Sequence, residues 1–332
     1  MTQSSHAPVY LQSYLAPFAH LLARADVTDI YVNRPHEIWV ETLGGATEHH
    51  ASPALSEATL NRLARQIAAI SHQGISREHP LLSATLPGGE RVQIALPPAT
   101  RGTAAFAIRK HVSPDLSLAD YVEAGAFDDT VRSNTTDTAA IDDRLAELLD
   151  AGDMAGLLST AVLARKNILI SGGTSTGKTS FLNALIREIP DTERLILIED
   201  TPELNMRHAN GIGLLATRSE LGEARVTAND LLSASLRMRP DRIIVGELRG
   251  PEAFTFLRAV NTGHPGSMTT VHADSAARAI EQIALLVLQS GAGLRRDEVV
   301  HYVRSTVDVY VQLARTAGRR HVAQVVLERH GL

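Results

Sequence analysis

The sequence Gly-Gly-Thr-Ser-Thr-Gly-Lys-Thr occupies residues 172–179 and matches the phosphate-binding loop pattern Gly-x-x-x-x-Gly-Lys-Ser/Thr. An apolar run at 167–171 precedes this loop, and a plausible helix at 179–188 follows it. Strand, loop and helix in this order surround a phosphate group with backbone N–H groups and a helix N-terminus. The flanking elements argue against a glycine-rich turn without a ligand, so the sequence predicts a site for a nucleoside triphosphate.

Each residue type in this loop suits one part of such a ligand. We expect the Lys178 ammonium group to contact the β- and γ-phosphates and the Thr179 hydroxyl to bind Mg²⁺. The candidate nucleotide-binding residues of the loop are Gly172, Gly173, Thr174, Ser175, Thr176, Gly177, Lys178, Thr179 and Ser180. ATP and Mg²⁺ are therefore the expected cofactors.

The composition is that of a folded protein of about two domains, with 332 residues, 44% of them apolar and 21% charged. A balance of 32 basic to 37 acidic residues gives a net charge of −5, so we expect no direct sequence-specific binding of nucleic acid. The absence of cysteine excludes disulfides, thiolate catalysis and Cys-ligated zinc. No apolar run approaches the ~18 residues of a membrane span and no signal pattern is visible, so we expect a cytoplasmic location.

The chain divides into three segments. Residues 1–112 predict a small α+β domain, with a helix at 56–71 and a hairpin around Pro87-Gly-Gly89. The polar stretch within 113–143 predicts a linker. Residues 144–332 alternate strands with helices, which predicts an α/β domain on a largely parallel sheet. The strands that we expect there are 167–171, 195–198, 243–246 and 267–271, and a terminal hairpin formed by 307–313 and 321–327.

The N-terminal segment 9–24 has helical spacing that Pro17 interrupts. Its apolar side chains allow two interpretations, a surface patch or packing on the core of the domain, and we favour the core. They are Tyr10, Leu11, Tyr14, Leu15 and Phe18.

Acidic residues follow two of the expected strands. Glu199, Asp200 and Glu203 come directly after strand 195–198, and Glu247 follows 243–246. The carboxyl ends of parallel strands are where α/β sheets bind ligands, although a strand exit also carries ordinary solvated acids. We expect Glu247 to orient the attacking water or hold Mg²⁺, and the three earlier acids to help place metal or water. For Glu199 and Glu203 taken alone, the sequence favours neither a role in ligand binding nor that of an ordinary acid at a strand exit.

Two histidines, His264 and His272, flank the strand expected at 267–271. Zinc is disfavoured because two histidines without further His or Cys ligands do not make a zinc site. We expect His272, and with less support His264, to donate a hydrogen bond to phosphate or to orient Glu247.

Taken together, these segments resemble the secretion ATPase superfamily. Residues 172–179 resemble its Walker A box and 198–203 its Asp box. Residues 239–250 resemble its unusual Walker B box, and 262–273 its His box. The segments 27–41, 80–92 and 106–110 resemble the N-terminal domain of the traffic ATPases of type IV secretion systems, the VirB eleventh-component family. Ala107 and Gly89 depart from the usual residues of that family.

The resemblance implies a RecA-like P-loop ATPase domain preceded by a smaller α+β domain, assembled as a homohexamer. It implies hydrolysis of ATP to ADP and phosphate, peripheral association with the inner membrane and contact with other secretion components. It also implies that Arg91 and Arg109 cover the triphosphate, a role that Arg249 could share. An ordinary surface position on a strand is the alternative for the first two arginines.

Two other functions stay open from the sequence. A pilus-retraction motor would use the same chemistry in a different machine, and the segment around Asn33-Arg-Pro35 weighs against it. A nucleotide-gated assembly scaffold would bind ATP with incidental turnover. Pilus and type II secretion ATPases with a four-Cys zinc module are excluded because the chain has no cysteine.

Overall fold

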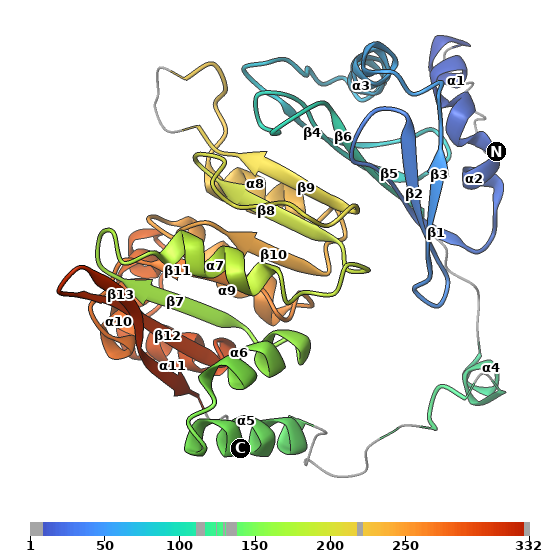
Figure 1. Ribbon diagram of the computed structural model, residues 1–332. Coiled ribbons are helices and arrows are strands. Elements are labelled where there is room, and N and C mark those ends of the chain that lie inside the picture. Colours follow the sequence, from blue (N-terminus) through green and yellow to red (C-terminus); the bar gives the residue numbers. More distant parts are fainter. Residues whose placement is uncertain are drawn as a thin grey trace.

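The computed structural model describes residues 9–110, 117–123, 125–128, 130, 138–217 and 222–328. Two sheets organise the chain, each with its own helices (Figure 1). The mixed α/β fold expected from the sequence is confirmed. None of the helices in the described part of the chain is long and apolar enough to span a membrane.

The N-terminal domain is built on a six-stranded antiparallel sheet in the order β3-β2-β1-β6-β5-β4. Its strands are β1 (Val27–Val32), β2 (Glu37–Thr42), β3 (Thr47–Ala51), β4 (Leu81–Thr85), β5 (Arg91–Ala95) and β6 (Ala105–Arg109). The helical segments are α1 (Val9–Leu15), the 3₁₀ turn η1 (Ala16–Phe18), α2 (Ala19–Ala23) and α3 (Glu57–Ile70). The predicted hairpin is present as β4 and β5. The Ser56 hydroxyl caps α3 by accepting the N–H of Thr59.

The N-terminal helices pack on this domain, as the favoured interpretation expects. Leu11 and Phe18 are fully buried in the core that α3 shares with the sheet, and only Tyr10 of the five candidate patch residues is largely exposed. Tyr14 and Leu15 are partly buried and pack against the same core, so most of these five side chains contribute to the domain rather than to its surface.

The C-terminal domain has a seven-stranded sheet in the order β13-β12-β7-β11-β10-β8-β9, parallel except for β13. Its strands are β7 (Ile168–Gly172), β8 (Leu195–Glu199), β9 (Gly211–Leu215), β10 (Arg242–Val245), β11 (Met268–Val271), β12 (Val309–Thr316) and β13 (Arg319–Leu327). The helices are α5 (Thr138–Asp150), α6 (Met154–Leu163), α7 (Lys178–Ile186), α8 (Ala228–Ser235), α9 (Glu252–Asn261), α10 (Ala276–Gln289) and α11 (Arg296–Thr306).

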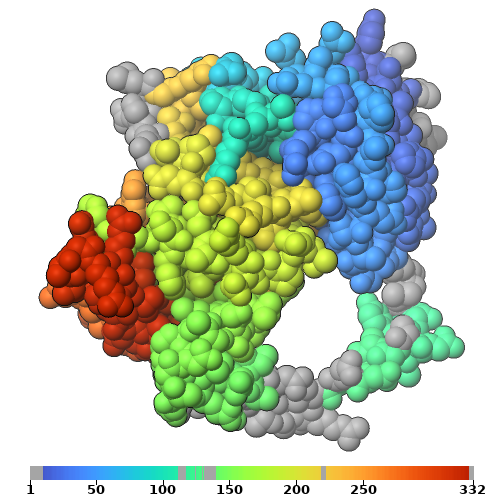
Figure 2. All heavy atoms as spheres, in the orientation of Figure 1, coloured from blue at the N-terminus to red at the C-terminus, as the bar shows by residue number. Residues whose placement is uncertain are grey.

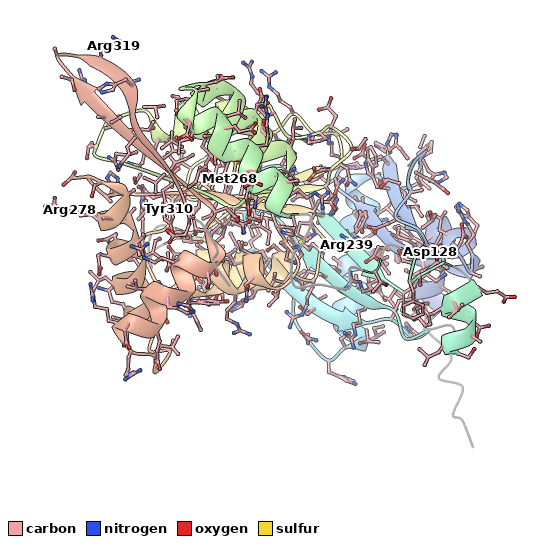
Figure 3. The ribbon with its side chains drawn as sticks, turned by 90° about the horizontal axis from the view of Figure 1, so that it is seen from below. Asp128, Arg239, Met268, Arg278, Tyr310 and Arg319 are labelled. Atoms are coloured by element: carbon pink, nitrogen blue, oxygen red, sulfur yellow. The ribbon has the colours of Figure 1, made fainter. Side chains whose placement is uncertain are left out.

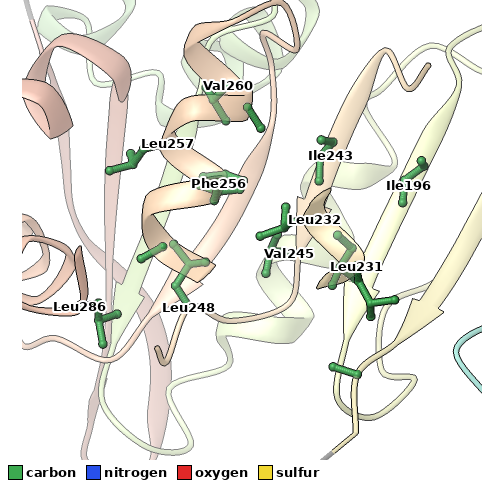
Figure 4. Packing of buried hydrophobic residues seen from close by; sticks show 14 of the residues in the cluster. Ile196, Leu231, Leu232, Ile243, Val245, Leu248, Phe256, Leu257, Val260 and Leu286 are labelled. Carbon is green, nitrogen blue, oxygen red and sulfur yellow. The ribbon is translucent and has the colours of Figure 1, made fainter. Parts of the chain in front are cut away.

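Strand β8 shows why the central strands are continuous apolar runs. Leu195 and Leu197 face the core formed with α5, α6 and α7, whereas Ile196 and Ile198 face α8, α9 and α10. Figure 4 shows this second core, with Ile196 beside helix α8 and Ile243. Alternate side chains point to opposite faces of a strand, and helices cover both faces here, so every position of β8 is buried.

The segment predicted as a linker contains two helices, α4 (Leu118–Glu123) and the start of α5. Helix α5 begins at Thr138 and belongs to the C-terminal domain, because Lys166 pairs with Asp142 and Leu145 is buried against α6. The remaining predicted linker positions 113–116, 124, 129 and 131–137 lie outside the described residues.

The two domains meet along β8 and β9, where the blue and teal N-terminal surface lies against the yellow surface (Figure 2). Arg194 is buried there, with its guanidinium 4.0 Å from the Tyr31 ring centre and a 2.8 Å hydrogen bond to Asn33 Oδ1. Arg239, labelled between the domains in Figure 3, pairs with Glu41 at 2.7 Å. The interface thus joins polar groups of both domains, of which Arg194 and Asn33 are buried and Arg239 is partly exposed.

Candidate functional site

A cleft of about 390 Å³ lies at the carboxyl ends of the parallel strands, above the 172–179 loop. Glycine is required at one position of that loop: Gly177 has φ 96°, a left-handed conformation, at the N-cap of α7. The cleft is lined by Thr174, Ser175, Thr176, Gly177, Lys178, Thr179, Ser180, Glu199, Asp200, Thr201, Glu203, Gly246, Glu247, Arg249, Thr270, His272 and Arg320. Segments far apart in sequence therefore converge on one site.

Lys178 lies folded back over its own loop. Its Nζ donates to the carbonyl oxygen of Gly172 at 3.0 Å and lies 3.8 Å from Glu247 Oε1. Partial burial lowers the pKa of Lys178, and Arg249 adds to that effect while Glu247 opposes it. Among the described residues, the nearest carboxylate to the Lys178 ammonium group is that of Glu247, 3.8 Å away. A phosphate group bound in the cleft would give this ammonium group a closer negatively charged partner.

Glu247 and His272 meet at the centre of the cleft. Glu247 follows β10 and His272 follows β11, and Glu247 Oε1 lies 3.0 Å from His272 Nε2. The other oxygen of Glu247 pairs with Arg249, which also contacts Asp200 Oδ2 at 2.8 Å. The predicted carboxylate, histidine and arginine thus form one connected group.

The acidic turn after β8 lies against the start of α7. Glu203 Oε2 accepts the Thr179 hydroxyl at 3.2 Å, and Asn183 donates to the Glu203 carbonyl oxygen at 3.0 Å. Glu199 is 4% exposed at its side chain, and its Oε1 accepts the backbone N–H groups of Glu203 and Leu204. Glu199 therefore stabilises the turn from within, while Asp200 and Glu203 are the acids on the open side.

The residues present fit a nucleotide with Mg²⁺. Glu247 Oε1 is buried, with His272 Nε2 3.0 Å and Lys178 Nζ 3.8 Å away. A carboxylate oxygen has two lone pairs, so Oε1 can also accept a hydrogen bond from an incoming ligand such as water. Within the described ranges, no three His, Asp or Glu side chains form a ready-made metal site. Mg²⁺ is usually bound through one or two protein oxygens together with substrate phosphates, and Thr179 and Glu247 are the residues here that would supply protein oxygens.

Three predicted residues lie elsewhere. His264 Nδ1 lies 2.9 Å from the carbonyl oxygen of Pro240, at the opposite end of β11 from His272, so it does not reach the phosphate loop of its own chain. Arg91 and Arg109 line a different cavity of about 720 Å³, together with Arg237. Within this chain Arg91 and Arg109 border that other cavity and not the cleft, so their role in covering the triphosphate stays a prediction.

Arg320 belongs to the cleft although the sequence motifs do not include it. It lies on β13, and its Nε donates to the carbonyl oxygen of Ser175 at 3.0 Å. The hairpin register sets Arg320 directly opposite Arg315, and Figure 3 shows this hairpin projecting from the domain with Arg319 near its tip. Facing like charges on a hairpin are unfavourable unless an anion lies near. The only sequence signal was a cluster of arginines at a turn.

Comparison with known proteins agrees with this geometry. The chain matches the family described as "Type II/IV secretion system protein" over residues 12–325. It is 39% identical to the type IV secretion system protein VirB11 of Bartonella henselae, over 98% of this chain and 94% of that protein. It is 40% identical to PtlH of Bordetella pertussis, over 92% and 91% of the two chains.

Among solved structures, the chain resembles the crystal structure of the VirB11 ATPase of the Brucella suis type IV secretion system in complex with sulphate. The TM-score is 0.89 at 36% identity, covering 96% of this chain and 94% of the other. Such coverage includes both domains and the cleft between motifs that lie far apart in sequence. This chain belongs to the Type II/IV secretion system protein family, in its VirB11 group.

Proposed function

We propose that this protein is an Mg²⁺-dependent ATPase that hydrolyses ATP to ADP and phosphate and so powers a type IV secretion system. The observation that carries the proposal is the junction of Lys178, Glu247 and His272 within one cleft at the end of a parallel sheet. Membership of the VirB11 group supports the biological role. The same group weighs against a pilus-retraction motor.

In this proposal the 172–179 loop binds the phosphates, with Lys178 beside the β- and γ-positions. Thr179 and the phosphate oxygens would hold Mg²⁺, which neutralises charge that develops during phosphoryl transfer. Glu247 Oε1 would accept a hydrogen bond from the attacking water, and His272 would hold that carboxylate in place. Arg249 would keep Asp200 and Glu247 from repelling each other.

We propose further that Arg91 and Arg109 act on the nucleotide of a neighbouring subunit. Arg91 and Arg109 are directly opposed on β5 and β6, and Arg109 Nε already donates to Asp29 Oδ1 at 3.0 Å. Arg91 and the remaining N–H groups of Arg109 would be the donors offered to an anion at this cavity. They border a cavity beside Arg237 rather than their own phosphate loop. A closed homohexameric ring is the arrangement that would bring this cavity to the next subunit's site.

The proposed ring would sit at the inner membrane by contact with other secretion components, as a peripheral cytoplasmic protein. Light scattering at micromolar protein with an ATP analogue and Mg²⁺ tests the assembly, and a monomer under those conditions would count against it. Release from membranes by high salt or alkaline carbonate tests the peripheral attachment.

The alternative function, a nucleotide-gated assembly scaffold, predicts that secretion needs ATP binding but not ATP hydrolysis. If only ATP binding matters, cells carrying Glu247→Gln should secrete normally, because that variant retains the binding loop. We expect such cells to lose secretion, as cells with Lys178→Ala should. Secretion by the first variant alone would favour the scaffold.

A further inference from the structure

The loop between β5 and β6 of the N-terminal domain attaches to β9, the edge strand of the other sheet. The backbone N–H of Arg101 donates to the Gly213 carbonyl oxygen at 3.0 Å, and the backbone N–H of Leu215 donates to the Ala99 carbonyl oxygen at 2.9 Å. Thr100 and Leu214 form an antiparallel bridge. Main-chain hydrogen bonds thus fix this N-terminal loop alongside the edge strand of the C-terminal sheet.

From that loop, the Arg101 side chain extends toward the acidic turn of the cleft. Its Nη1 donates to the Leu204 carbonyl oxygen at 2.8 Å, and its Nη2 pairs with Glu199 Oε2. The two side chains are 20% and 4% exposed. Gly213 leaves the path open, because a Cβ atom there would overlap the Cδ and Nε atoms of Arg101.

With this contact, both carboxylate oxygens of Glu199 have partners. One oxygen of that carboxylate accepts the N–H groups of Glu203 and Leu204, at 2.9 and 2.7 Å, and the other faces Arg101. Because the guanidinium fork reaches Glu199 and the Leu204 carbonyl together, it holds both ends of the turn. That turn carries Glu203, which accepts the Thr179 hydroxyl.

We propose that Arg101 is a positioning residue for ATP hydrolysis, through which the N-terminal domain holds the acidic turn 199–204 at the Mg²⁺-binding end of the cleft. The proposal rests on the ATPase function proposed above. Arg101 lines no part of the cleft and acts through Glu199. A shift of the N-terminal domain on β9 would therefore displace Glu203 relative to Thr179 and slow the chemical step.

The test compares Arg101→Ala with Arg34→Ala in the full-length protein. Arg34 also crosses between the domains, donating to the Ala209 carbonyl oxygen at 3.0 Å, but it does not touch the acidic turn. For Arg101→Ala we expect kcat to fall about tenfold to a hundredfold and the Mg²⁺ concentration for half-maximal activity to rise. Binding of ADP without Mg²⁺ should change by less than about twofold, because the phosphate loop is intact.

The Arg101→Ala substitution leaves the Glu199 carboxylate buried without its cation. Because an unpaired buried charge is strongly destabilising, this variant can fail to fold. Gly213→Ala then decides the matter, since it displaces the Arg101 side chain and keeps both charges. Its matched control is Gly102→Ala, where a Cβ atom meets nothing within 4 Å. We expect Gly213→Ala to lower kcat with ADP binding retained, and Gly102→Ala to behave as wild type.

Unchanged kcat in the folded Arg101→Ala or Gly213→Ala protein overturns the inference. So does an equal loss in Arg34→Ala, which would mean that the whole interface matters and not this contact. Absence of ATPase activity in the wild type is a different result, because it contradicts the proposed function itself.

Discussion

Glu247 and His272 come from the ends of two adjacent strands, β10 and β11, and meet with Oε1 of the glutamate 3.0 Å from Nε2 of the histidine. Neighbouring parallel strands bring their carboxyl ends to one edge of the sheet, so residues 25 positions apart share one site. Glu247 Oε1 is buried beside the imidazole, and both residues line the cleft. This relationship is the reason to assign water positioning to Glu247.

His272 is expected to act through Glu247. His272→Ala should lower kcat about tenfold to a hundredfold with little change in ATP affinity, because the carboxylate keeps its charge and loses its orientation. His272→Asn should recover part of the rate, since its amide can still donate to the carboxylate. Steady-state phosphate release separates kcat from KM. A rise in KM alone would assign His272 to ground-state binding of the phosphates.

Arg320 is expected to bind the nucleotide from its own subunit. Arg320→Ala should weaken ATP and ADP to similar extents, by roughly tenfold, because the group lies beside Ser175 and Gly177. Arg319→Ala is the matched control, one residue along the same hairpin and absent from the cleft. Fluorescence titration with a labelled nucleotide measures both, and equal affinities for the two variants would remove Arg320 from the site.

Arg109 is expected to work across a subunit boundary. Arg109→Ala should lower kcat and weaken ATP more than ADP, at a cost of about 1.5–3 kcal/mol, roughly a ten- to hundredfold effect. Lys at this position should rescue only in part, because it lacks the bidentate fork.

A mixture of two impaired variants, Arg109→Ala and Lys178→Ala, tests whether Arg109 acts in trans. A subunit with Arg109→Ala keeps its phosphate loop, and one with Lys178→Ala keeps its arginines, so some interfaces in mixed rings would be complete. We expect ATPase activity to reappear on mixing. If the activity of the mixture stays at the sum of its two components although mixed rings form, Arg109 does not complete a neighbour's site.

His264 predicts a pH dependence of stability. Burial lowers its pKa below the ordinary 6.5, so the unfolded chain takes up the proton at a higher pH than the folded one. Stability therefore rises with pH across the window between the two pKa values and is lost as pH falls through it. When the pH is lowered from about 7.5 to about 5.5, the melting temperature of His264→Gln should fall by less than that of the wild type. His301→Gln, on an exposed surface of α11, serves as the control, and identical slopes would contradict the prediction.

The sequence predicted the central strands well, because helices bury both faces of β8 and β10 and leave nearly continuous apolar runs. It missed β9 and β3. β9 reads Gly-Ile-Gly-Leu-Leu, and its two glycines weaken the strand pattern, whereas β3 is a mostly polar edge strand. Periodicity has little to detect in either.

The residues of the candidate site likewise fall into those that the sequence predicted and those that it missed. Lys178, Glu247 and His272 were predictable because each directly follows a recognisable strand or loop. Arg101 and Arg320 were not, because their positions depend on how the N-terminal domain contacts β9 and on β12 lying beside β7. Conversely, His264 has the right residue type near the right strand, and only the direction of β11 shows that it lies at the wrong end.

The most direct test of the account measures nucleotide binding and phosphate release on the same preparations of wild type, Lys178→Ala and Glu247→Gln, with and without Mg²⁺. We predict that Lys178→Ala loses nucleotide binding. Glu247→Gln should bind ATP within about threefold of wild type and release phosphate about 10²–10³-fold more slowly. Chelation of Mg²⁺ should stop wild-type turnover. Phosphate release by Glu247→Gln at the wild-type rate would contradict the central claim that this carboxylate positions the attacking water.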